Sequence, residues 1–184
     1  IMPSLVGSEM CIRDRYGITS YAKSMENCSN SGNITIVNTE KNDPEYGPAL
    51  TACGVIGECR QKITGCSNTG NISVTNKGGK KSTTRATIAG VFSSSAKAAS
   101  RCYNTGNISY KGACTDYSLD KAIWVQGVGT GYGTSECYNT GKITVKLTSG
   151  TACVGGVSYA GRKLKNCYNT CLLYTSDAAD DMQC

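Results

Sequence analysis

Histidine is absent from this sequence. A Ser-His or Cys-His nucleophile pair is therefore excluded, and a zinc site would have to use cysteines alone. None of the twelve cysteines stands in a Cys-x-x-Cys spacing, and no apolar run approaches the ~20 residues that a membrane-spanning helix needs. We therefore predict no catalytic residues, no metal site, no cofactor and no membrane span within this sequence.

Acidic residues are also few. Residues 16–170 contain seventeen basic and eight acidic residues, a net charge of +9. Such a balance permits an anionic partner, for example nucleic acid or an anionic cell-wall polymer. The basic residues are scattered, and the one cluster among them is Lys77 with Lys80, Lys81 and Arg85. This cluster lies in a glycine-rich stretch without the interleaved aromatic residues on which bases stack, so we interpret it as a solvated loop and disfavour nucleic acid.

The scarcity of carboxylates bears on polysaccharide cleavage, because general acid and base catalysis needs two placed carboxyl groups. Asp43 with Glu45, and Asp116 with Asp120, are close enough in sequence to meet, but we interpret both pairs as solvated loop charges. A lyase of the parallel β-helix kind would need acidic and basic side chains on one face of adjacent repeats. Aligning the repeats produces no such stack. The sequence therefore predicts a chain that is not an enzyme.

The two ends of the chain are related to each other. When residues 9–15 and 171–176 are translated back into codons, they are reverse complements, and both resemble the transposon end of a sequencing-library adapter. Two unrelated protein termini have no physical reason to be related in this way. We therefore interpret residues 1–15 and 171–184 as adapter-derived and exclude them, so that a signal peptide or an anchor can be neither inferred nor ruled out.

The remaining residues 16–170 repeat one motif, Cys-x-Asn-Ser/Thr-Gly, followed after one residue by isoleucine. The fifth copy is cut short at Thr170. A Gly-apolar pair such as Gly54-Val55 precedes each cysteine by nearly constant steps, whereas the stretch after the isoleucine varies, so insertions collect at one corner. The repeats span about residues 16–38, 52–76, 86–111, 124–147 and 151–170.

The units are short, punctuated by glycine and rich in Val, Ile, Thr and Tyr, without a helical apolar period, which favours strands. Asn-Thr-Gly between two such runs is typical of a turn. One unit of two or three short strands cannot bury its apolar face alone, whereas stacked copies form a continuous interior. The sequence thus predicts an all-β fold, a parallel β-solenoid resembling a right-handed β-helix and built from about five tandem repeats. A β-propeller is the alternative, but each unit has too few strand-like runs for four full strands.

In-register stacking would place equivalent residues above one another at ~4.8 Å. Asparagines in such a column can form an amide ladder, isoleucines can fill the interior, and cysteines can form a column of small buried thiols. Disulfides are the alternative for the cysteines, but five equivalent positions cannot all pair. The predicted columns are Cys28, Cys66, Cys102, Cys137 and Cys167; Asn30, Asn68, Asn104, Asn139 and Asn169; and Ile34, Ile72, Ile108 and Ile143. The pairing of Cys53, Cys59, Cys114 and Cys153, which lie outside the motif, is left open.

If the cysteines face inward, alternation turns the next residue outward. Tyr103, Tyr138 and Tyr168 hold this position in the last three repeats, and Ser29 and Ser67 hold it in the first two. We call the three tyrosines the tyrosine column. Aligned rings could form a strip that binds sugar rings or a partner's apolar side chains; the alternative is that they stack on one another and only stabilise the scaffold.

At Gly54-Val55-Ile56-Gly57 and at each Cys-Tyr-Asn-Thr-Gly, the chain resembles the GLUG-type repeats of bacterial surface proteins, whose units carry a Gly-apolar core before a Cys-Tyr-x-Thr-Gly turn. The resemblance covers almost all of residues 16–170. It implies a large secreted or wall-attached protein of a Gram-positive anaerobe, in which this segment is a stalk or an adhesive module.

The function that we expect is therefore a non-catalytic structural or adhesive segment of a larger extracellular or cell-wall-attached protein. Its partners would be neighbouring repeats of that protein and a glycan, a host protein or a cell-surface protein. Two alternatives remain, a polysaccharide-binding or polysaccharide-lyase-like parallel β-helix and a basic module that binds anionic polymers.

Overall fold

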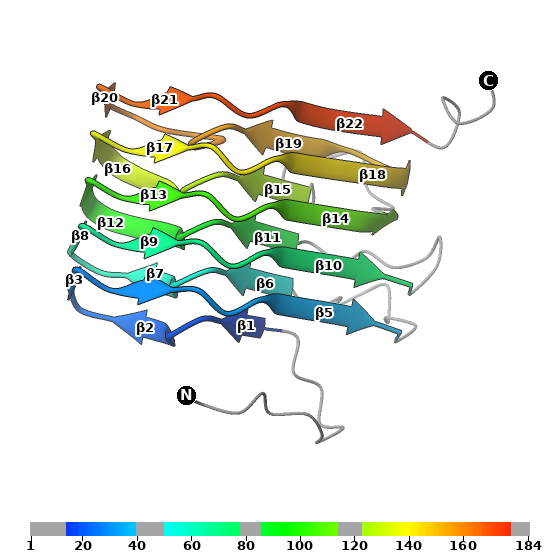
Figure 1. Ribbon diagram of the computed structural model, residues 1–184, viewed down its shortest axis with the longest axis horizontal. Helices are drawn as coiled ribbons and strands as arrows, with labels where there is room; N and C mark the ends of the chain where they lie inside the picture. The colour runs from blue at the N-terminus through cyan, green and yellow to red at the C-terminus, as the bar shows by residue number, and fades with distance from the viewer. Residues whose placement is uncertain (1–13, 40–49, 78–85, 114–122, 178–184) are drawn as a thin grey trace.

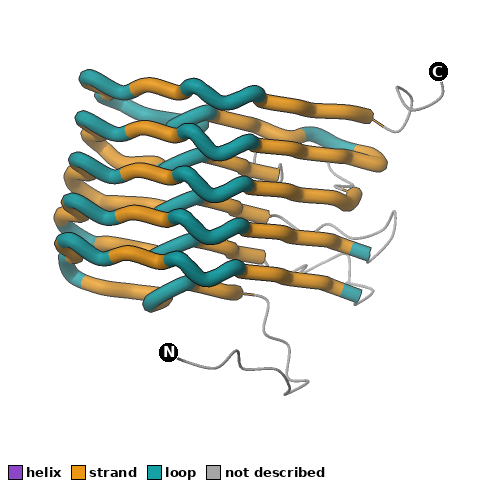
Figure 2. Tube along the Cα trace, in the orientation of Figure 1, coloured by secondary structure: helices purple, strands orange, loops and turns teal. Residues whose placement is uncertain are grey.

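The computed structural model describes residues 14–39, 50–77, 86–113 and 123–177. The regular secondary structure of these residues consists of β-strands joined by short bends, and the strands form parallel sheets that are stacked along one axis as a β-solenoid (Figures 1 and 2). The predicted fold class is thus confirmed. No helix in the described ranges has the length and apolarity needed to cross a membrane.

Each layer of the solenoid, which we call a rung, contributes to four parallel sheets. Sheet A contains β1 (Asp14–Tyr16), β6 (Leu50–Cys53), β11 (Ala86–Ala89), β15 (Ile123–Gln126) and β19 (Ala152–Gly155). Sheet B contains β2 (Thr19–Ala22), β7 (Ile56–Cys59), β12 (Phe92–Ser100), β16 (Thr130–Ser135) and β20 (Leu164–Lys165), together with β3 (Met25–Glu26) and β8 (Lys62–Thr64). Sheet C contains β4 (Ser29–Asn30), β9 (Ser67–Asn68), β13 (Tyr103–Asn104), β17 (Tyr138–Asn139) and β21 (Tyr168–Asn169). Sheet D contains β5 (Ile34–Asn38), β10 (Ile72–Asn76), β14 (Ile108–Ala113), β18 (Ile143–Ser149) and β22 (Leu173–Asp177).

A rung therefore holds four or five strands, more than the two or three expected from the sequence. The difference arises because the strands of sheet C are only two residues long, too short to show an alternation of apolar and polar residues. The register follows the motif as predicted, since Ile72 pairs with both Ile34 and Ile108 in sheet D, and Asn104 pairs with both Asn68 and Asn139 in sheet C.

Two strands extend past the boundaries drawn from the sequence. Strand β1 begins at Asp14, and β22 pairs with β18, where Leu173 lies opposite Ile143 and continues the aliphatic column. The interpretation of residues 1–15 and 171–184 as adapter-derived stays a prediction.

The variable stretches connect sheet D of one rung to sheet A of the next. Residues 40–49, 78–85 and 114–122 lie outside the described ranges. Several residues singled out in the sequence lie there, namely Asp43, Glu45, Lys80, Lys81, Arg85, Cys114, Asp116 and Asp120.

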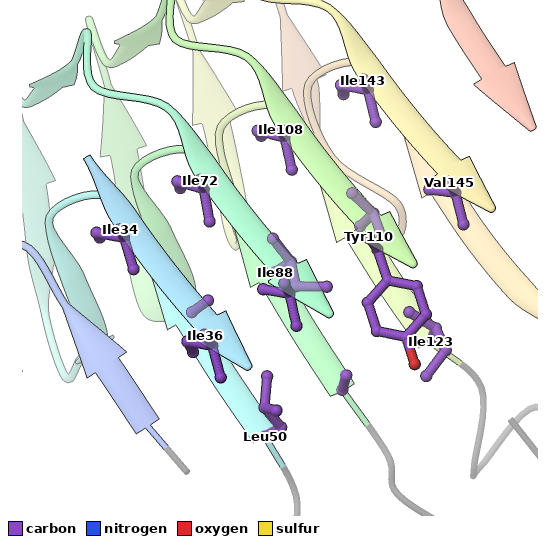
Figure 3. Close-up of a cluster of buried hydrophobic side chains, with 14 of the residues drawn as sticks. Ile34, Ile36, Leu50, Ile72, Ile88, Ile108, Tyr110, Ile123, Ile143 and Val145 are labelled. Atoms are coloured by element: carbon purple, nitrogen blue, oxygen red, sulfur yellow. The ribbon is translucent and has the colours of Figure 1, made fainter. Parts of the chain in front are cut away.

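The interior consists of two apolar clusters. The first lies between sheets A and D, where Ile34, Ile72, Ile108 and Ile143 stack in line and are each less than 9% exposed (Figure 3). The second lies inside sheet B and contains Val91 and Phe92 together with the buried cysteines Cys59, Cys66, Cys102 and Cys137. Burying one such aliphatic side chain stabilises the fold by about 1.5–3 kcal/mol. A rung can bury these side chains only against the rungs next to it.

Candidate functional site

The asparagine column forms a continuous amide ladder, as predicted. Nδ2 of Asn30, Asn68, Asn104 and Asn139 each donates to Oδ1 of the asparagine on the next rung, at 2.7–2.9 Å. The same Nδ2 donates to the backbone carbonyl two residues later, at 2.7–2.9 Å, which closes the Asn-Ser/Thr-Gly turn. Because the three central amides are fully buried, the ladder is the means by which their polar atoms are satisfied.

A column of glycines lies against this ladder. It occupies the bend from sheet A to sheet B, where a Cβ on Gly90 would collide with the carbonyl oxygen of Gly127 and with the amide of Asn104. The equivalent positions on the other rungs are Gly17, Gly54, Gly127 and Gly156. The close approach of sheet C to the bend explains why a Gly-apolar pair precedes each cysteine at a nearly constant distance.

The cysteine column faces the interior. Cys66, Cys102 and Cys137 are fully buried, and none of the nine described cysteines forms a disulfide. Each thiol of the column donates to the backbone carbonyl two residues earlier, at 3.2–3.5 Å. The neighbouring thiols of Cys137 and Cys66, together with burial, raise the pKa of the Cys102 thiol. The three central thiols of the column are buried as predicted, whereas Cys28 and Cys167 on the end rungs are half-buried. Cys53, Cys59 and Cys153 form no disulfide in the structure either. The reduced state of the column stays a prediction.

The residue before each of these cysteines is in the left-handed region, which the sequence analysis did not detect. The φ angles are 51° at Asn27, 62° at Gly65, 52° at Arg101, 54° at Glu136 and 53° at Asn166. Asn and Gly are the residues that adopt this conformation most readily, so their recurrence before the cysteine was a signal that could have been read. Arg and Glu do so at a cost of about 1–2 kcal/mol.

The tyrosine column faces outward and its rings stack on one another. The ring centroids of Tyr103 and Tyr138 are 4.9 Å apart and those of Tyr138 and Tyr168 are 5.0 Å apart, with interplanar angles of 2° and 3°. Both faces of the Tyr138 ring are thus covered, and burial together with the neighbouring tyrosines raises its pKa. Because a sugar ring needs a free aromatic face, this geometry favours the self-stacking alternative over a recognition strip.

Two further asparagine columns were missed. Oδ1 of Asn33, Asn71 and Asn107 accepts from the backbone N–H of the equivalent residue on the next rung, at 2.8–3.0 Å. Asn38 donates through Nδ2 to Oδ1 of Asn76 at 3.1 Å. Both columns could have been found by aligning the repeats beyond the cysteine motif.

Within the described ranges there is no cluster of three or more Cys, Asp and Glu side chains that could hold a metal ion. The predicted carboxylate pairs and most of the basic cluster lie outside those ranges, and only Lys77 of that cluster is described, at the end of sheet D.

Comparison with known proteins adds no relative. No family model, curated protein or solved structure matches this chain.

Proposed function

We propose that this chain is a non-catalytic structural segment of a larger extracellular or cell-wall-attached protein, and that it acts as a stalk or adhesive module. The observation that carries the proposal is the amide ladder, which runs through all five rungs without interruption. Every rung needs the next one to satisfy its asparagine, so the fold is suited to extension by more rungs of the same kind. The GLUG-type resemblance of the motif supports a place in a bacterial surface protein.

The stacked tyrosines support a scaffold role. Replacing Tyr103 and Tyr138 by serine removes two stacked ring pairs, each worth about 0.5–1.5 kcal/mol. We expect the melting temperature of this double variant to fall clearly below that of the parent. Tyr132→Ser is the matched control, because Tyr132 is 53% exposed on sheet B and the Arg162 guanidinium lies over its ring. An unchanged melting temperature in the double variant, with loss of glycan binding, would assign the tyrosine column to recognition.

Catalysis is tested separately. The full chain is incubated with acidic and neutral polysaccharides, and the products are followed by the absorbance of unsaturated uronates and by reducing-end assay. We expect neither signal above the level of a heat-denatured sample. Steady product formation would contradict the non-catalytic role and favour the lyase alternative.

A further inference from the structure

A polar groove lies at the corner where sheet B ends, on the outside of the first three rungs. It has a volume of about 510 Å³. Its lining comes from β3, β8 and the residue after β12, and includes Glu26, Gln61, Lys62, Thr64 and Arg101. A volume of this size is within the range of ~300–1,000 Å³ that is typical of small-molecule sites.

The register of sheet B explains why the groove is open. Lys62 is followed in its column by Ala98 and Gly133 on the next two rungs, so no large side chain covers its ammonium group. The adjacent column contains Glu26, Thr64, Ser100 and Ser135, which places hydroxyl groups along the solenoid axis. Thr64 Oγ1 and Ser100 Oγ are 3.2 Å apart and share a hydrogen bond.

The groove has unpaired positive charge. Neither Lys62 nor Arg101 forms an ion pair with any described residue, and the one surface pair beside them, Arg60 with Glu58 at 3.9 Å, leaves both free. On the first three rungs, this corner carries five cations and two carboxylates. The cations are Lys23, Arg60, Lys62, Lys97 and Arg101, and all of them are exposed.

Arg101 also occupies a position at which arginine is unfavourable. Its φ of 52° lies in the left-handed region, where the equivalent residues on three other rungs are Asn or Gly. An arginine there lowers stability by about 1–2 kcal/mol relative to a residue that tolerates this conformation. Glu136 has the same conformation on the next rung, so the backbone alone does not explain the choice of residue. Arg101 differs from Glu136 in that its exposed side chain lines the groove.

We infer that the groove binds an acidic oligosaccharide, with Lys62 and Arg101 holding carboxylate groups of the sugar. Ammonium and guanidinium groups are strong donors to carboxylates. Glu26, Gln61 and Thr64 provide acceptors and donors for sugar hydroxyl groups. The residues that line the groove include no aromatic ring on which a base could stack, so nucleic acid fits it less well. This inference rests on the proposed adhesive role and names the class of its partner.

The test is calorimetric titration of the full chain with an oligogalacturonate and with its neutral methyl ester. The variant Lys62→Gln with Arg101→Asn removes both positive charges and places at residue 101 a side chain suited to a positive φ. The control variant Lys111→Gln with Lys146→Gln removes the same charge from two exposed, directly paired lysines of sheet D.

We expect the parent to prefer the acid over the ester, and the groove variant to lose about tenfold or more in affinity while the control keeps it within about twofold. Equal losses of affinity in both variants would show that binding depends only on the net charge of the protein, and this would overturn the inference. An equal affinity for acid and ester, or a tighter binding to single-stranded DNA, would overturn it as well. Melting temperature and product assays on the same samples report on the scaffold role, so the two proposals fail separately.

Discussion

At the scale of the residue, the stability of this protein depends on buried polar side chains. Their donors and acceptors are all hydrogen-bonded in one arrangement only. Asn104 donates to the Gly106 carbonyl and to Asn139, and it accepts from Asn68, all within the interior. Thr134 has the opposite character. Its Oγ1 is the one buried side-chain nitrogen or oxygen without a hydrogen-bond partner in the described part of the chain.

Asn104→Asp should destabilise the fold by at least about 3 kcal/mol at neutral pH, because a buried carboxylate would face the acceptor oxygens of Gly106 and Asn139. Those oxygens and burial raise the pKa of the new carboxyl group in the folded state. The variant therefore loses the full amount of stability above that pKa. The loss becomes smaller as the pH falls through that pKa, because the protonated acid can again donate a hydrogen bond. Urea unfolding at neutral and acidic pH measures both effects. Asn107→Asp, on the exposed column, keeps its acceptor and should change stability little.

Thr134→Val should raise the free energy of unfolding by about 1 kcal/mol, since the substitution removes an unpaired buried hydroxyl at nearly constant volume. Its column contains Ile63, Ala99 and Leu164, so a methyl group suits the surroundings. Thr144→Val, on the outer face of sheet D, is the control and should be near neutral. A destabilised Thr134→Val protein would mean that the hydroxyl has a partner after all.

At the scale of the element, the bend between sheets A and B and the turn before the cysteine set the path of each rung. The glycine of the bend lets sheet C approach so closely that the asparagine ladder packs against it. The left-handed residue before the cysteine turns the chain from sheet B into sheet C on every rung. Short strands are sufficient because these two turns, rather than strand length, fix the geometry.

Gly90→Ala should therefore prevent correct stacking of the central rungs. The added methyl group would meet the backbone carbonyl of Gly127 and the side chain of Asn104, which the ladder holds in place. We expect a loss of more than about 3 kcal/mol or an insoluble product, measured by thermal unfolding monitored by circular dichroism. Gly133→Ala is the control, because no atom lies within 4 Å of its added Cβ. A stable Gly90→Ala protein would show that the bend tolerates a side chain.

We expect the thiols of the cysteine column to be protected from alkylating reagents in the folded protein and to become reactive when it is unfolded. In the native state, an alkylating reagent should spare Cys66, Cys102 and Cys137, which are fully buried. Under denaturing but non-reducing conditions, at least four of the five motif cysteines should label, as read by mass spectrometry. Recovery of a Cys66 to Cys102 bridge in most molecules would contradict the thiol column.

At the scale of the whole molecule, stability is shared between neighbours rather than concentrated in one core. The aliphatic, thiol and amide columns each pass through successive rungs, so the central rungs are buried on two sides while the end rungs are more exposed. Ile34 of the first rung is 8% exposed, and Leu173 of the last rung is 43% exposed. Removing an end strand therefore costs less than disturbing a central one.

A chain of residues 16–170 should retain nearly all the β signal of the full chain in circular dichroism. Trimming removes β22 and most of β1, which lie in the outermost rungs, and leaves the columns of the central rungs intact. Loss of most of the signal would show that the excluded ends belong to the fold.

The sequence by itself determined the architecture, because a motif repeated in register has to place Cys, Asn and Ile in columns once the strands are parallel. The burial of these columns and the outward direction of the tyrosines followed from alternation alone. Tertiary structure decided what depends on contacts between distant segments. The glycine column matters only where sheet C approaches the bend, and the tyrosines could be identified as a self-stacking ladder only from the tilt and spacing of their rings. The groove was invisible in sequence because Lys62 and Arg101 are 39 positions apart and become neighbours only when the rungs stack.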